Sequence, residues 1–476
     1  MMNHSEIEPY SINSINDERR KLLADVTSDS EVVRSYTEIG EPITVVRHKS
    51  QGTSWYAAVF LVVNAALGAG LLNFPEAYHK SGGIVVAVVV QAVLMVFIVG
   101  ALIILAYCSD IDQACTYQET VHSMCGPIAK HASSLAVALY CFGTCITFLI
   151  IIADQWDSFL TYMDGPTFCY KWYFNRKFTL STTAVIFILP LCFPRRIDFL
   201  KYASVLGVIG VVYCVFLVSY KYFQGDGETP GPIRTSPESW VDVFIVVPVI
   251  CFGYQCHVSV IPIYSCLAKR TVPEFTKTIM VAILICVLTY TFTAIFGYLT
   301  FGSKINSDIL LGYKHKDGLI LTAVVLIGIK MYTTYPILLF CGRAAFDSVW
   351  VEVRQLSATA IAEGEAARRI VTVVFWFFLS LILAVFVPNI SMVISVLGSL
   401  AALFIFTFPG MCLLKMLLEG YVDPIETKVR YWLLSAMAVV YLILGAFIFG
   451  VVITQSIWND FFKARVPSQS LMPCAA

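Results

Sequence analysis

Charged residues are scarce in this chain of 476 residues: aspartate, glutamate, lysine and arginine together make up 13% of it, whereas 58% is hydrophobic. A soluble globular protein of this size needs far more polar surface. The composition therefore excludes that class and predicts a polytopic membrane protein. The formal net charge is zero, and no basic patch interleaved with aromatic residues is present, so we predict no nucleic-acid partner.

The sequence also lacks an apolar leader. The first 50 residues are polar, and Asp17, Glu18 and Arg19 stand where the hydrophobic region of a cleavable signal peptide would lie, so we expect insertion to begin with the first spanning helix. Most of the fifteen cysteines fall inside apolar segments, where a thiol behaves as a small buried hydrophobe. Only Cys169 and Cys474 are expected to face a non-cytosolic space, so no disulfide framework is predicted.

Long apolar runs fill most of the chain. A helix needs roughly 20 apolar residues to cross the hydrocarbon core, and eleven segments reach that length. They lie near residues 54–78, 82–107, 129–154, 178–194, 202–223, 240–266, 275–301, 318–343, 371–388, 391–418 and 430–454. The predicted fold is an all-α polytopic membrane protein with eleven transmembrane helices in residues 54–454.

Lysine and arginine set the predicted orientation. If the N-terminus is cytosolic, the loops on that side carry about twice as many of these residues as the opposite side. The first helix then runs outward and the sixth inward. Residues 54–223 and 240–418 would form a 5+5 inverted repeat, the eleventh helix at 430–454 would be an addition, and the tail 455–476 would be luminal or extracellular.

Two of the apolar segments are interrupted at matching positions in the two halves. The first contains a Gly-Ala-Gly sequence at residues 68–70, followed by Pro75, and the sixth contains Pro248, Gly253 and Pro262. Glycine and proline weaken a helix, and within a bilayer the released backbone groups need protein, ion or solute partners. Matching interruptions predict a transporter with broken helices 1 and 6 and a substrate site at the breaks.

The first break is predicted to bind the carboxylate of an amino acid. The N-terminus of a half-helix offers free N–H groups and a partial positive charge. Gly68, Ala69 and Gly70 would let a carboxylate approach the backbone closely. The alternative is that these small residues only allow tight helix packing.

The second break is predicted to hold the rest of the substrate. Phe252 and Tyr254 can enclose its side chain, and the unwound backbone near Cys256 can accept hydrogen bonds from its ammonium group. His257 titrates near physiological pH and is a candidate for pH sensitivity. A core histidine satisfied by a neighbouring carbonyl is the alternative.

Sodium is the predicted coupling ion, with protons as the alternative. Unwound carbonyls together with a hydroxyl or amide oxygen can coordinate it without a full negative charge. Asn64, before the first break, and Thr334 in the eighth segment are the candidate donors, with Thr333 as a second choice. A threonine inside a helix more often bonds back to a preceding carbonyl of its own helix. We expect no other metal and no cofactor.

Lys330 stands four residues before Thr334, on the same face of the eighth segment. A lysine within the membrane is costly and usually faces protein or water. It could pair with Asp154, line the cytosolic vestibule, or place its ammonium group beside the sodium position. In the last arrangement it would weaken or replace sodium dependence.

The tail of residues 1–53 is polar and expected to be disordered. It contains an acidic dileucine pattern ending in Leu22 and Leu23, and a tyrosine-based pattern from Tyr36 to Ile39. Short extended peptides of this kind dock on sorting adaptors through a few side-chain pockets. The two patterns favour the lysosomal membrane, and the plasma membrane stays open as the alternative.

Four stretches resemble the sodium-coupled neutral amino acid transporters of the amino acid/auxin permease superfamily: VNAALGAGLLNFP, CFGYQCHVSVIPIY, YPILLFCGRA and VISVLGSLAALFIFTFPG. The likeness runs from about residue 54 to 454 and is nearest to the lysosomal glutamine-type branch. It implies an eleven-helix inverted repeat and sodium-coupled import of glutamine, asparagine or a related neutral amino acid. By matching motifs, Asn64 and Thr334 take the sodium positions, whereas Lys330 departs from the pattern.

The rival interpretation is an amino-acid-sensing transceptor that signals through its cytosolic tail. Binding without turnover would distinguish it from a transporter. An enzyme is not predicted, because the sequence has no HExxH helix or other recognisable catalytic constellation. A channel would be expected to show a ring of like charge or a carbonyl filter.

Overall fold

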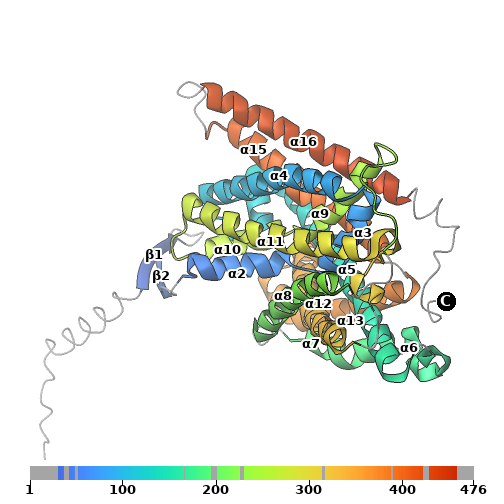
Figure 1. Cartoon of the computed structure of the whole chain (residues 1–476). Helices are drawn as coiled ribbons and strands as arrows, with labels where there is room; N and C mark the ends of the chain where they lie inside the picture. The colour runs from blue at the N-terminus through green and yellow to red at the C-terminus, as the bar shows by residue number, and fades with distance from the viewer. Residues whose placement is uncertain are drawn as a thin grey trace, which may run out of the picture. The chain divides into compact units, whose positions relative to one another are not determined.

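The structure, a computed structural model of the whole chain, describes residues 30–36, 42–48, 52–165, 167–194, 201–225, 230–313, 317–387, 390–421 and 428–457. The chain forms a small unit of Met1–Ser54 with Cys266–Lys269, and a large unit that holds the remainder. The large unit is built from helices (Figure 1).

The small unit contains a pair of antiparallel strands, β1 (Ser30–Tyr36) and β2 (Pro42–His48), in which Val32 lies opposite Val46. At these residues the structure departs from the expectation of a disordered tail, which stays a prediction for the tail as a whole. Both strands are rich in β-branched residues, which favour an extended backbone. Leu22, Leu23 and Ile39 of the sorting patterns lie outside the described residues.

In the large unit the first predicted span is bent. It consists of α2 (Trp55–Ala66) and α3 (Gly70–Lys80), which meet at an angle of 60°. The other helices are α4 (Ile84–Ile111), α5 (Tyr117–Asp164), α6 (Arg176–Thr183), α7 (Leu189–Cys192), α8 (Lys201–Gln224), α9 (Val246–Gly253), α10 (His257–Ser265), α11 (Val272–Phe301), α12 (Gly318–Val353), α13 (Ala358–Phe386), α14 (Ile390–Ala402), α15 (Phe408–Leu418) and α16 (Lys428–Ile457).

Ten spans are evident among the described residues: nine helices that are long and apolar enough to cross a membrane, and the bent pair α2 and α3. One of the nine, Asp242–Ser265, contains α9 and α10 and is the sixth predicted span. The predicted fourth span is helical without a gap from residue 176 to residue 192, through α6, a π-helical turn at Ala184–Ile188, and α7. None of these three elements is long enough to cross a membrane by itself. The count of eleven therefore stays a prediction, whereas the all-α polytopic class is confirmed.

Local sequence explains where the longest helix begins and bends. Thr116 caps α5: its side chain accepts from the Glu119 backbone N–H, while the Glu119 carboxylate accepts from the Thr116 N–H, as in a capping box. Gly126 then adopts a φ of 83° directly before Pro127, which separates a short first arm from the spanning part. A side chain at position 126 would be strained by this backbone conformation.

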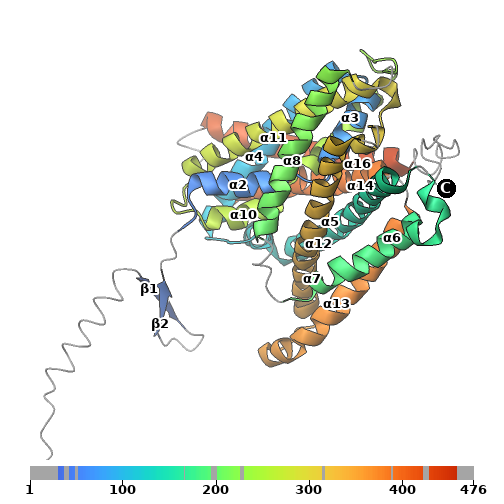
Figure 2. The same cartoon turned by 60° about the horizontal axis from the view of Figure 1, so that its bottom comes forward.

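The half-helices lie among the long helices. α3 packs on α9 and α11, α2 packs on α11, and α9 packs on α14. Elsewhere in the large unit, α5 packs extensively on α12, and both helices are labelled in Figure 2. The two interrupted spans are thus surrounded by protein, where their free backbone groups can find partners.

Candidate functional site

The first break covers Leu67, Gly68 and Ala69, between the end of α2 and the start of α3. The first turn of α3 is loosely closed: the N–H groups of Leu71 and Leu72 donate to the carbonyls of Gly68 and Ala69 at 3.4 Å each. Backbone groups in such a loose turn are available for other partners. The predicted unwinding at residues 68–70 is therefore present at the start of α3.

The second break covers Tyr254, Gln255 and Cys256, between α9 and α10. It approaches the first break closely. A Cβ atom added to Gly70 would lie 3.1 Å from the Cα atom of Gly253, which is tighter than an ordinary contact. The glycines thus let the two half-helices touch backbone to backbone, and the predicted breaks face one another.

Tyr290 of α11 joins both breaks. Its hydroxyl oxygen lies 2.8 Å from the carbonyl oxygen of Ala66 and 2.9 Å from that of Gly253, and it accepts from the N–H of Gly68 at 3.4 Å. Ala66 and Gly253 are the last residues of α2 and α9, where helix carbonyls lack intrahelical partners. Phe74 of α3 stacks on the Tyr290 ring with 4.4 Å between centroids.

Lys330 of α12 reaches the first break. Its ammonium group donates to the carbonyl of Leu67 at 2.5 Å, and only 3% of the residue is exposed. A cation at this place is favoured because the C-terminus of α2 carries a partial negative charge. Of the three arrangements considered for Lys330, pairing with Asp154 is wrong, because Asp154 forms an ion pair with Arg176 at 2.6 Å.

Of the residues predicted to bind sodium, the two threonines contact the backbone of this lysine. The hydroxyl of Thr334 donates to the carbonyl of Lys330 at 2.7 Å, and that of Thr333 donates to the carbonyls of Ile329 and Lys330 at 3.0 Å each. Both threonines thus bond back to their own helix. Asn64 is half-buried on α2, one turn before the break.

The residues predicted to hold the substrate side chain are nearly all buried. Tyr254 is 0% exposed, and its hydroxyl accepts from the Gln91 amide at 2.9 Å. His257 is also 0% exposed and shares a hydrogen bond of 3.0 Å between Nδ1 and Gln255 Oε1. This partner fits the core interpretation for Nδ1 only, because the other ring nitrogen, Nε2, is buried without a hydrogen-bond partner. Phe252 and Cys256 are buried beside them.

A polar cluster lies on the α3 side of the first break. The Asn73 amide of α3 donates to Glu76 Oε2 at 2.9 Å, to the Ser307 carbonyl at 3.0 Å and to Ser391 Oγ of α14 at 2.8 Å. The Ser391 hydroxyl also donates to Glu76. We call Asn73, Glu76, Ser307 and Ser391 the outer cluster. It joins α3 to α14 and to the loop between α11 and α12.

Sequence reasoning did not find Tyr290, Gln91 or the outer cluster. Each joins segments that are far apart along the chain, by 222 residues for Gly68 and Tyr290 and by 318 for Asn73 and Ser391. The available signal was a polar side chain within an apolar run, which is unusual in a membrane. That signal marks Gln91 and Asn73 as candidates but does not name their partners.

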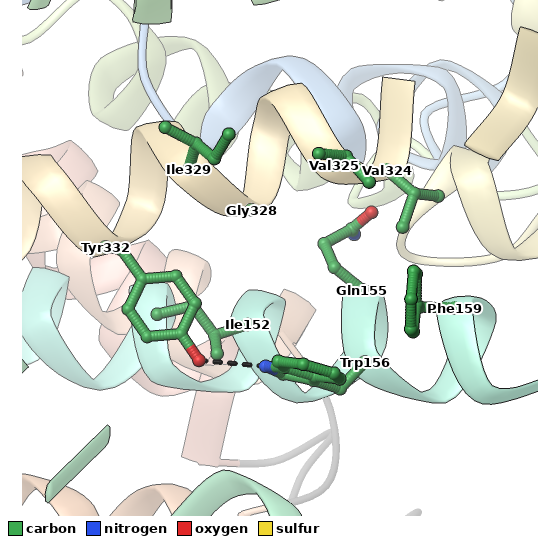
Figure 3. Close-up of a pocket in the computed structure, with 9 residues that line it drawn as sticks. All are labelled: Ile152, Gln155, Trp156, Phe159, Val324, Val325, Gly328, Ile329 and Tyr332. Carbon is green, nitrogen blue, oxygen red and sulfur yellow. Dashed lines mark hydrogen bonds between the residues drawn. The ribbon is translucent and has the colours of Figure 1, made fainter. Parts of the chain in front are cut away.

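A cavity of about 250 Å³ lies between α5 and α12, and none of its lining residues belongs to either break (Figure 3). Its lining is mainly apolar, from Ile152 and Phe159 on α5 to Val324 and Ile329 on α12. At one side the Trp156 indole N–H donates to the Tyr332 hydroxyl at 2.8 Å. An amino acid zwitterion would lose its hydration there with few replacement hydrogen bonds, so this cavity is not the predicted substrate site.

The facing half-helices within a bundle of spanning helices define a membrane transporter of the broken-helix type. The crystal structure of MhsT in complex with L-phenylalanine aligns with a TM-score of 0.52 at 14% identity, over 85% of this chain and 99% of that one. This likeness shows the fold of a LeuT-type transporter, which is built from an inverted repeat. The predicted fold class is confirmed.

The family model described as transmembrane amino acid transporter protein matches residues 51–458. Sodium-coupled neutral amino acid transporter 7 from Danio rerio is 43% identical over 417 residues, which cover 87% of this chain and 89% of the relative. The Homo sapiens protein of that name is also 43% identical, over 86% of this chain and 88% of the relative. Solute carrier family 38 member 8 from Homo sapiens is 36% identical, over 85% and 94%.

The chain therefore belongs to the transmembrane amino acid transporter family. It is a multi-pass membrane protein and a transporter, not an enzyme. The family resemblance drawn from the four sequence stretches is confirmed.

Proposed function

We propose that this protein is a secondary active symporter that moves glutamine, asparagine or a related neutral amino acid into the cytosol, coupled to sodium or protons, at the lysosomal membrane. The observation that carries the proposal is the contact between the two breaks, where Gly70 meets Gly253 and Tyr290 bonds to both half-helices. Half-helix ends at such a junction offer donors to a carboxylate and carbonyls to an ammonium group or a cation.

The proposed substrate site has two sides. The N-terminus of α3, at Gly68, Ala69 and Gly70, faces the substrate carboxylate. Phe252, Tyr254, Cys256 and His257 belong to the opposite break. Because Tyr254 and His257 are fully buried in this conformation, the substrate must enter with a rearrangement of the half-helices, as expected for alternating access.

The proposed cation site lies at the C-terminus of α2, with Asn64 and Thr334 as oxygen donors. The ammonium group of Lys330 contacts the Leu67 carbonyl at this place. A sodium ion would compete with a tethered charge that is already there. Sodium dependence should therefore be weak, and another cation could use the membrane potential, worth roughly 2.3 kcal/mol per charge per 100 mV.

Counterflow in proteoliposomes tests the proposal. Purified protein loaded with one unlabelled amino acid should exchange it for labelled glutamine or asparagine, and a panel of substrates would rank the two. Binding without exchange would instead support the transceptor interpretation. Lysosomal delivery is tested separately, by imaging the full chain and a variant in which Leu22, Leu23, Tyr36 and Ile39 are replaced by alanine.

Lys330→Ala tests the role of the lysine. Removal of the tethered ammonium frees the Leu67 carbonyl, and uptake should then increase with sodium several-fold more strongly than in the wild type, while its dependence on pH changes. Lys177→Ala, at an exposed lysine at the start of α6, is the control. If Lys330→Ala leaves the sodium and pH dependence unchanged, the lysine does not act on coupling.

A further inference from the structure

Asp308 is a buried acid outside the spanning helices, in the loop between Val272–Lys304 and Gly318–Val353. The residue is 0% exposed. Its Oδ1 accepts from the backbone N–H of Leu310 at 2.9 Å, and its Oδ2 accepts from the side-chain amide of Gln155 on α5 at 2.8 Å. Both oxygens are thus held by neutral donors.

The cation that acts electrostatically on Asp308 is paired with other acids. Arg176 of α6 forms ion pairs with Asp154 and Asp157 of α5. The titratable and charged groups that interact electrostatically with Asp308 are Asp154 on α5, Arg176 on α6 and Cys214 on α8. Asp154 raises the pKa of Asp308 and Arg176 lowers it.

An ionised carboxylate in this place is costly, because burial without a paired cation disfavours the charged form. Burial, followed by repulsion from Asp154, raises the pKa of Asp308 to about 8. Among the described residues no three His, Cys, Asp or Glu side chains converge closely enough to hold a metal ion. Burial of the carboxyl group among neutral donors therefore favours a bound proton.

Gln155 suits both protonation states of Asp308. In the structure its N–H donates to the acid, while its Oε1 is buried without a hydrogen-bond partner. If the amide turns over, the same Oε1 can accept a hydrogen bond from the protonated carboxyl group. This change of the Gln155 side chain from donor to acceptor needs no backbone movement.

The loop that carries Asp308 contributes Ser307 to the outer cluster. The carbonyl of the preceding residue, Ser307, accepts from Asn73 of α3 at 3.0 Å. α3 is the outer half of a broken helix, so an outward opening that withdraws α3 also removes this contact. Water would then reach Asp308 and stabilise its charged form.

We propose that Asp308 is a proton-binding residue of the transport cycle, which must take up a proton from the non-cytosolic side before the outer cluster closes. This inference rests on the proposed transport function. It assigns the proton a site separate from the substrate and cation positions at the breaks, and it makes outward closure depend on pH.

Counterflow measured at pH 7 and pH 9, with equal pH on both sides of the membrane, tests the inference. The protonated fraction of a group with a pKa of about 8 falls about tenfold over this interval, and wild-type exchange should fall similarly. Asp308→Asn resembles the neutral acid, so its exchange should be the same at both pH values. Asp164→Asn, at an exposed acid at the end of α5 paired with Lys171, should follow the wild type.

A second variant covers the case in which Asp308→Asn does not fold. Gln155→Leu removes a donor to the charged form, so the fall in exchange should move to higher pH. A fall in Asp308→Asn equal to that of the wild type, or an unmoved profile in Gln155→Leu, would overturn the inference and leave the proposed function intact.

Absence of exchange in the wild type at every pH would instead refute the proposed function. The proton site is then judged by infrared spectroscopy of the purified protein. A carboxylic-acid band that titrates in the wild type and is missing in Asp308→Asn supports the inference, and equal bands in both proteins contradict it.

Discussion

The Tyr290 hydroxyl is the smallest group whose removal should separate the two breaks. Tyr290→Phe keeps the ring that stacks on Phe74 but leaves the carbonyls of Ala66 and Gly253 without this donor. Loss of a partner to buried polar groups costs about 1–3 kcal/mol. We expect a lower unfolding temperature together with reduced counterflow, measured in detergent and in proteoliposomes.

A tyrosine far from the breaks supplies the control. The hydroxyl of Tyr441 on α16 donates to the Phe97 carbonyl at 2.6 Å, and the residue is 1% exposed. Tyr441→Phe should lower stability by a similar amount and leave the ratio of turnover to folded protein unchanged. Equal loss of specific turnover in both variants would show that Tyr290 acts on stability alone.

At the scale of single residues, the sequence was most informative at glycine and proline. Glycine and proline act on their own backbone, so the breaks could be located from Gly68, Gly70 and Gly253 without knowledge of any partner. Tyr290 and Asp308 act through contacts with distant segments. Neither differs in the sequence from the other tyrosines and acids of the chain, so their roles became visible only when those segments were brought together.

At the scale of elements, the contact between α3 and α9 should tolerate no added methyl group. A Cβ atom on Gly253 would lie 2.7 Å from Cε2 of Phe74, a ring already stacked on Tyr290. Gly253→Ala should therefore push the half-helices apart and lower counterflow by more than tenfold, about 1.4 kcal/mol or more in activation free energy. Gly450→Ala in α16, where nothing lies within 4 Å, should leave it unchanged.

Helix positions were easier to predict than helix continuity. Hydrophobic length located the spans, since a run of roughly 20 apolar residues is visible without any fold. The π-helical turns at Ala184–Ile188 and Leu403–Thr407 were not foreseen, because the sequence there stays apolar and the turns depend on packing. The strands β1 and β2 were not predicted for another reason. The tail is polar as a whole, and this polarity obscured the β-branched residues of the two strands.

For the whole molecule, the prediction with most consequence is that the helical pieces of residues 176–192 cross the membrane. If they do, the spans number eleven and the two ends of the chain lie on opposite sides. An inverted 5+5 repeat requires this, because an odd number of spans in each half reverses the direction of the second half. The excess of lysine and arginine on one side then assigns the N-terminus to the cytosol.

Protease protection of epitope tags in sealed vesicles measures the two ends directly. A tag before Met1 should be cleaved from the cytosolic side, and a tag after Ala476 should be protected until the membrane is permeabilised. A third tag, inserted at residue 166 between α5 and α6, should share the protection of the C-terminal tag. If both terminal tags are cleaved from the same side, the segment 176–192 does not span the membrane. The two halves of the chain would then not form an inverted 5+5 repeat.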